Sequence, residues 1–139
     1  MDKKSLEEYR SKKDEIAELD WTLRNRWQDE GLIGNNVIMD YRKGYPRPRN
    51  VIGFDYPRYD RLQERDRARK AILLTECEEV EEWIEQIPDS LTRRIFKMTY
   101  IEGRKQKAVA KAVNLDRSRI SRRIDDYLSS QTEKTERNI

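Results

Sequence analysis

The stretch from Asp89 to Ser130 decides the fold, and it reads DSLTRRIFKMTYIEGRKQKAVAKAVNLDRSRISRRIDDYLSS. Apolar residues recur in it at helical spacing, in three runs that polar residues and a glycine separate. The first run follows Pro88 and stops at Gly103, the second covers Gln106 to Val113, and the third begins near Arg117 and ends near Ser129. The sequence therefore predicts three consecutive helices, with a short turn between the second and the third.

This turn contains the residues that a helix-turn-helix requires. Asn114 tolerates the left-handed backbone conformation better than most residues other than glycine. Ala110 is small enough for two helix backbones to approach each other. Leu115 is expected to fill the core from the turn, and Asp116 is expected to cap the third helix. We therefore interpret the stretch as a helix-turn-helix of the kind that binds DNA.

The third helix has an outward face once Ile120, Ile124 and Leu128 point inward. Arginine suits guanine edges, and serine hydroxyls suit bases or phosphates. We expect four residues to read base edges: Arg117, Ser118, Ser121 and Arg122. We expect four more to neutralise backbone phosphates: Lys105, Lys107, Arg119 and Arg123. The alternative is a three-helix core whose outer face is only solvated.

Charge is distributed unevenly along the chain. The net charge is only +3, but residues 104–123 carry eight bases and one acid, whereas residues 76–85 carry six acids and no base. Such asymmetry predicts one face for a polyanion such as double-stranded DNA. The acidic face is interpreted either as a solvated surface or as the binding surface of a basic partner.

Two long helices are predicted before the helix-turn-helix, so the expected fold class is all-α. Residues 5–30 place an apolar stripe at helical spacing: Leu6, Tyr9, Ile16, Leu19, Leu23 and Trp27. Residues 60–87 contain a heptad seam: Leu73, Cys77, Val80, Ile84 and Ile87. Upstream, Asp66 and Arg69 interrupt this seam. The two helices are expected to close a hairpin within the chain or to form a homodimer interface.

Residues 31–59 join these helices and contain glycines and prolines that forbid a continuous helix. The Pro-Arg-Pro core of this segment favours an extended chain. We interpret it as an extended Tyr/Arg/Pro-rich loop that either packs on the helices or contacts nucleic acid or a protein partner. The residues of such an accessory contact are Arg42, Lys43, Tyr45, Arg47 and Arg49.

Several runs of this sequence resemble region 4 of sigma-70-type factors. They are residues 87–96 (IPDSLTRRIF), 100–103 (YIEG), 109–110 (VA) and 120–124 (ISRRI). Within that group the chain resembles the small phage late-transcription regulators of the RinA/ArpU type, which also carry a Tyr-, Arg- and Pro-rich segment before the domain. The resemblance implies a promoter- or operator-binding activator of phage or prophage late genes that contacts RNA polymerase.

Composition argues against other classes of function. The chain has no histidine, so Ser-His-Asp and Cys-His catalytic arrangements and imidazole metal sites are excluded, and we expect no enzyme activity, metal or cofactor. The single cysteine, Cys77, cannot form an internal disulfide and is expected to be a buried thiol. No apolar run is long enough for a membrane span, so we expect a cytoplasmic protein of a bacterial host.

The expected organisation has five segments. They are an N-terminal helix (1–30), the extended linker (31–59), a second helix (60–87), the helix-turn-helix domain (88–130) and a flexible tail (131–139). Two alternatives assign the same elements another function. The first is a small terminase-like subunit that assembles into a ring and recognises phage DNA. Its oligomeric state would distinguish it from a regulator. The second is a helical protein-interaction module, which would show no salt-sensitive DNA binding.

Overall fold

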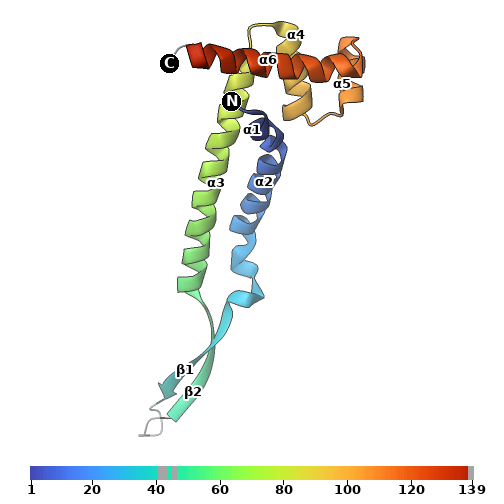
Figure 1. Cartoon of the computed structure of the whole chain (residues 1–139). Helices are drawn as coiled ribbons and strands as arrows, with labels where there is room; N and C mark the ends of the chain where they lie inside the picture. The colour runs from blue at the N-terminus through green and yellow to red at the C-terminus, as the bar shows by residue number, and fades with distance from the viewer. Residues whose placement is uncertain (41–43, 45–46, 138–139) are drawn as a thin grey trace. The chain divides into compact units, whose positions relative to one another are not determined.

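The computed structural model of the chain describes residues 1–40, 44 and 47–137, and for residues 35–40, 47–52 and 135–137 it describes the backbone alone. The chain divides into two compact units. Unit 1 consists of Met1–Ile16 and Ile72–Ile139, and unit 2 consists of Ala17–Ala71. Helices dominate the described residues, which confirms the expected all-α class (Figure 1).

The first predicted helix, residues 5–30, is divided in the structure. α1 covers Lys3–Glu7 and α2 covers Tyr9–Asn25, and two short 3₁₀ turns follow, η1 (Arg26–Gln28) and η2 (Glu30–Leu32). The side chain of Asp2 caps α1 by accepting from the Ser5 amide at 2.8 Å. The α-helix therefore ends at Asn25, before the predicted end at residue 30.

The 3₁₀ turn η1 changes which residue faces inward at the end of the apolar stripe. Leu6, Tyr9 and Ile16 are buried as predicted, but Trp27 is 62% exposed and Arg26 is buried in its place. A 3₁₀ turn has three residues per turn, so the third residue after Leu23 takes the inward position instead of the fourth. The prediction that Trp27 belongs to the buried stripe was wrong for this reason.

The predicted extended linker contains a two-stranded antiparallel sheet. β1 (Ile33–Asp40) pairs with β2 (Arg47–Phe54), in a register that places Ile33 opposite Phe54 and Asp40 opposite Arg47. The two strands are therefore extended, as the prolines indicated, and they pair with each other, which we did not predict from the sequence. The aromatic ring of Phe54 packs against Tyr56 and Tyr59, with centroids 4.9 and 5.4 Å apart.

α3 covers Tyr56–Glu85 and begins earlier than the predicted residue 60. Pro57 stands in its first turn, where a missing amide hydrogen costs nothing. The Asp55 side chain accepts from the Arg58 amide at 3.1 Å and so caps the helix start. Within unit 1, all five residues of the predicted seam are buried: Leu73, Cys77, Val80, Ile84 and Ile87. The seam therefore closes inside the chain.

The helix-turn-helix lies where the sequence predicted it. α4 (Ser90–Phe96) continues into the π-helical turn η3 (Lys97–Ile101), and α5 (Gln106–Val113) and α6 (Arg117–Arg137) follow. α4 and α5 both contact α6 (Figure 1). α6 continues to Arg137 where we expected a flexible tail after Ser130, because the intervening residues include no glycine or proline and several good helix formers.

Unit 1 has an aromatic cluster at the centre of its core. The ring of Phe96, which is fully buried, packs against Trp83 of α3, Tyr100 of η3 and Tyr127 of α6, with centroids between 5.5 and 5.7 Å apart. The compact unit that contains the helix-turn-helix is thus larger than residues 88–130, because it includes α1, the start of α2 and the end of α3.

The turn of the helix-turn-helix depends on Asn114. Its φ of 57° and ψ of 42° place it in the left-handed region, and its amide donates to the Ala110 carbonyl. We expect Asn114→Val to lower the free energy of unfolding by about 1–2 kcal/mol, because a branched Cβ clashes with the backbone in this conformation. Asn114→Gly should change it by less than about 0.5 kcal/mol. Urea denaturation followed by circular dichroism measures both, and equal losses would contradict this account of the turn.

Candidate nucleic-acid interface

The outward face of α6 carries three of the predicted DNA-contacting residues side by side. Ser118, Arg119 and Arg122 are all exposed, because Ile120 and Ile124 on the opposite side of the helix are buried. In the described part of the chain, neither Arg119 nor Arg122 has an ion-pair partner. Two unpaired guanidinium groups and a hydroxyl therefore point away from the core and can reach a ligand.

Arg117 and Ser121 lie at one edge of this face. Arg117 is exposed in the first turn of α6, and its Nε donates a long hydrogen bond, 3.5 Å, to Oε1 of Gln106 in α5. Ser121 is half-buried and lines a hollow of about 270 Å³ together with residues of α1, η3 and α5. The structure thus brings Arg117 close to α5 and turns Ser121 partly away from the outer face.

Arg123 lies at the opposite edge and already has partners within unit 1. Its Nη1 donates to Oδ2 of Asp89 at 3.3 Å and to Oγ1 of Thr92 at 3.4 Å. Asp89 is the N-cap of α4, and the hydrogen bonds from Thr92 lower the pKa of its carboxyl, with a smaller contribution from the positive charge of Arg123. Arg123 therefore joins α6 to the start of α4, and only part of its guanidinium is free for a phosphate.

The predicted phosphate-binding lysines stand at the start of α5. Lys105 is the residue before the first turn of the helix and Lys107 is within that turn, and both are exposed. Lys111, which we did not predict to contact DNA, is exposed one turn farther along α5. Among the described residues these three lysines make no ion pair. They extend the basic surface from α6 onto α5.

Two acids of α6 lie beside this surface or among its arginines. Asp125 is paired with Lys3 of α1 at 3.1 Å. Asp126 lines a shallow hollow of about 330 Å³ on α6 together with Leu115 and three arginines, Arg119, Arg122 and Arg123. Leu115 is half-buried there, so the turn leucine covers the core from outside instead of filling it. The surface can thus attract a polyanion and also offers an apolar side chain beside the arginines.

The predicted accessory contact lies in the hairpin of unit 2. Arg42, Lys43 and Tyr45 fall outside the residues that the structure describes. Arg47 and Arg49 belong to β2, where they pair with Asp40 and Ile38 of β1 through the backbone. The structure therefore places two of the five nominated residues on a strand of the hairpin.

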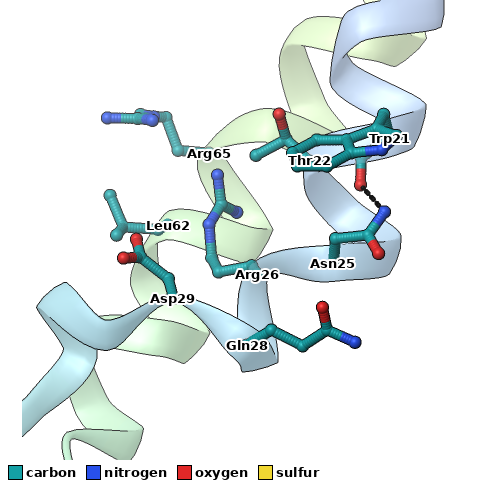
Figure 2. A pocket seen from close by; sticks show the side chains of 8 residues that line it. All are labelled: Trp21, Thr22, Asn25, Arg26, Gln28, Asp29, Leu62 and Arg65. Carbon is teal, nitrogen blue, oxygen red and sulfur yellow. Dashed lines mark hydrogen bonds between the residues drawn. The ribbon is translucent and has the colours of Figure 1, made fainter.

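Unit 2 also contains a hollow of about 510 Å³, shown in Figure 2. Its lining comprises Trp21, Thr22, Asn25, Arg26, Gln28, Asp29, Leu62 and Arg65. Several of its polar groups are engaged inside the unit: Asn25 donates to the Trp21 carbonyl at 2.7 Å, and Arg26 is ion-paired with Asp66. We therefore regard this hollow as a by-product of helix packing and not as the functional site.

Sequence reasoning missed a buried polar cluster in unit 2. The guanidinium of Arg26 is paired with the Asp66 carboxylate and donates to Oε1 of Gln63 at 2.7 Å. Gln63 in turn donates to the Leu23 carbonyl at 3.1 Å. Asp66 interrupts the predicted heptad seam, and a buried acid in such a position could have indicated a basic partner on the opposing helix. Arg69, the other interruption, is exposed.

No protein-family model, no curated protein and no solved structure matches this chain. Across the residues that the structure describes, no helix has the length and apolar character needed to cross a membrane. In the same part of the chain, no group of three or more Cys, Asp or Glu side chains is arranged to hold a metal ion. The function is therefore inferred from the residues of the helix-turn-helix.

Proposed function

We propose that this chain is a sequence-specific, double-stranded DNA-binding transcription regulator. As its resemblance to the RinA/ArpU-type regulators implies, it would activate phage or prophage late genes and contact RNA polymerase. The observation that supports DNA binding best is the exposed and unpaired basic surface of α5 and α6. In the helix-turn-helix, α5 is the first helix of the motif and α6 is the second. The second helix is the one that enters the major groove in DNA-binding proteins of this kind.

In this proposal the residues divide into two sets by what they can reach. Ser118 and Arg122 stand at the centre of the outward face of α6 and read base edges, with Arg117 beside them at the first turn. Lys105, Lys107 and Arg119 flank that face and neutralise phosphates. Ser121 and Arg123 contribute less to DNA binding. Ser121 is half-buried, and Arg123 is hydrogen-bonded to Asp89 and Thr92.

The direct test is selection of binding sites from phage and bacterial genomic fragments with the purified protein. We expect enrichment of one motif, with an affinity that falls steeply as salt rises, because phosphate contacts release counterions. A protein that enriches no motif and shows no salt-sensitive DNA binding near physiological ionic strength would refute the proposal. Light scattering that reveals a large ring would favour a terminase-like subunit instead.

The two sets of residues should respond differently to substitution. We expect Arg122→Ala to cost about 1–3 kcal/mol at the selected site and to relax the base preference at one position. Lys107→Ala should weaken binding to all DNA sequences alike and reduce the slope of log affinity against log salt by about one. Lys134→Ala, which removes an exposed charge farther along α6, is the matched control and should change neither quantity. If Arg122→Ala and Lys107→Ala behave alike, the assignment of the base-reading face is wrong.

A further inference from the structure

Unit 1 has a second surface feature, a groove of about 390 Å³ between the C-terminal part of α3 and the turn η3. It is lined by Glu81, Ile84 and Glu85 of α3, by Lys97 and Ile101 of η3, and by Glu102. Ile84 is fully buried and Ile101 is half-buried. The aliphatic surface that a partner could touch therefore comes from Ile101 and from the methylene groups of the charged side chains.

The rim of this groove is acidic and partly neutralised from within the chain. Glu81 accepts from the Tyr9 hydroxyl and faces Lys13 at 3.9 Å. Glu85 pairs with Lys97, and Glu102 pairs with Arg104 at 3.0 Å. These contacts hold the rim carboxylates in place while leaving each about half exposed. The rim is thus mainly acidic, with Lys97 as the one cation among its described lining residues, and it surrounds an apolar floor.

Further acids continue the rim along α3. Glu78 and Glu82 are exposed, and each lies three residues before a rim residue, Glu81 or Glu85, so each neighbours a rim acid on the solvent side of α3. Within the described residues neither Glu78 nor Glu82 has an ion-pair partner. The acids from Glu78 to Glu85 span about 10 Å of helix, which corresponds to two turns.

We propose that this groove docks a basic amphipathic segment of a partner protein, with one or two aliphatic side chains over Ile101 and Lys or Arg over Glu78, Glu82 and Glu85. Charge complementarity selects this occupant, because the groove has an apolar floor and the acids Glu78 and Glu82, unpaired within the described part of the chain, stand beside its rim. Its residues are different from those of the basic surface on α5 and α6. The inference therefore does not depend on the proposed DNA function.

The experiment measures binding of a fluorescently labelled amphipathic helix of leucine and lysine to the full chain by anisotropy. We expect a dissociation constant on the order of 10 µM at low salt, which weakens as salt screens the rim charges. The double variant Glu78→Gln/Glu82→Gln should weaken binding about tenfold, since it removes two charges without changing side-chain length. Ile101→Ala should weaken it severalfold by removing part of the apolar floor.

Matched controls separate the groove from general attraction between opposite charges. Asp14→Asn/Glu133→Gln removes two exposed acids elsewhere in unit 1 and should change the affinity by less than about twofold. The same helix built with glutamate in place of lysine should not bind. DNA affinity of Glu78→Gln/Glu82→Gln should match that of the natural chain, and circular dichroism checks that each variant is folded.

Four results would overturn the proposal. The first three are failure of the leucine-lysine helix to bind, equal binding of the helix with glutamate in place of lysine, and equal weakening of binding by the control variant. The fourth is self-association of the chain in light scattering together with loss of peptide binding. The last result would assign the groove to a second copy. If the natural chain binds the leucine-lysine helix but no DNA, the proposed function is refuted and the groove proposal stands.

Discussion

Replacing Arg26 with alanine is expected to lower the free energy of unfolding of unit 2 by about 3 kcal/mol. Arg26 is 7% exposed and Asp66 is 4% exposed, so the variant leaves a carboxylate buried without its main partner. Losses of 3–5 kcal/mol are typical when one member of a buried ion pair is removed. We expect the lower end of that range, because the hollow that Arg26 lines admits water beside it. Urea denaturation and hydrogen exchange at residues 56–71 measure the effect.

A second arginine in the same cluster provides a matched control. Arg65 also donates to Asp66, at 3.0 Å, but its side chain is 62% exposed. Arg65→Ala should therefore cost less than about 1 kcal/mol. The double variant Arg26→Met/Asp66→Leu replaces the pair by apolar side chains and should be close to the natural chain in stability. Equal losses of stability for Arg26→Ala and Arg65→Ala would show that burial does not determine how much each arginine stabilises the fold through Asp66.

The same pair predicts how stability depends on pH. Burial by itself would raise the pKa of Asp66, but hydrogen bonds from Arg65 and Arg26 and their charges hold it below its usual value. A carboxyl with a lowered pKa in the folded state stabilises the fold above its unfolded pKa, about 3.9, and this stabilisation is lost as pH falls through the folded pKa. The chain should therefore lose stability below about pH 4, and Arg26→Met/Asp66→Leu should lose less.

The helix-turn-helix could be predicted closely because its constraints are local. The left-handed Asn114, the buried Ala110 and the inward spacing of Ile120 and Ile124 are all properties of neighbouring residues. The end of α2 could not be predicted in this way. There a switch from α-helical to 3₁₀ geometry at Arg26 reverses which side chain faces inward, and periodicity assumes that the geometry continues.

The candidate site shows the same division between local and distant causes. The exposure of Ser118 and Arg122 follows from the helical period of α6 alone. Arg123 is different, because its partner Asp89 lies 34 residues earlier in the chain. Ser121 is half-buried because α6 packs beside residues of α1 that precede it by more than a hundred positions. Contacts of this kind depend on tertiary packing, so a single sequence does not disclose them.

Phe96→Ala is expected to produce the largest loss of stability in unit 1, about 3–5 kcal/mol. Phe96 is fully buried, and its ring packs against Trp83, Tyr100 and Tyr127, so truncation leaves a cavity and removes three aromatic contacts. Phe96→Leu retains most of the volume and should cost about 1–2 kcal/mol. DNA affinity should fall only as the folded fraction falls, with the base preference unchanged, whereas Arg122→Ala should change the preference without unfolding the protein.

Hydrogen exchange of Phe96→Ala also tests which residues stabilise the helix-turn-helix. Trp83 belongs to α3, yet its ring contacts Phe96 and Tyr127, with centroids 5.5 and 5.7 Å apart. Because the same aromatic cluster joins α3, α4 and α6, the variant should lose protection at residues 72–85 together with α4 and α6. If α4–α6 lost protection while residues 72–85 kept it, the helix-turn-helix would be an independent domain that begins near residue 88. Loss of protection in both parts would instead show that the end of α3 belongs to the same cooperative unit as the helix-turn-helix.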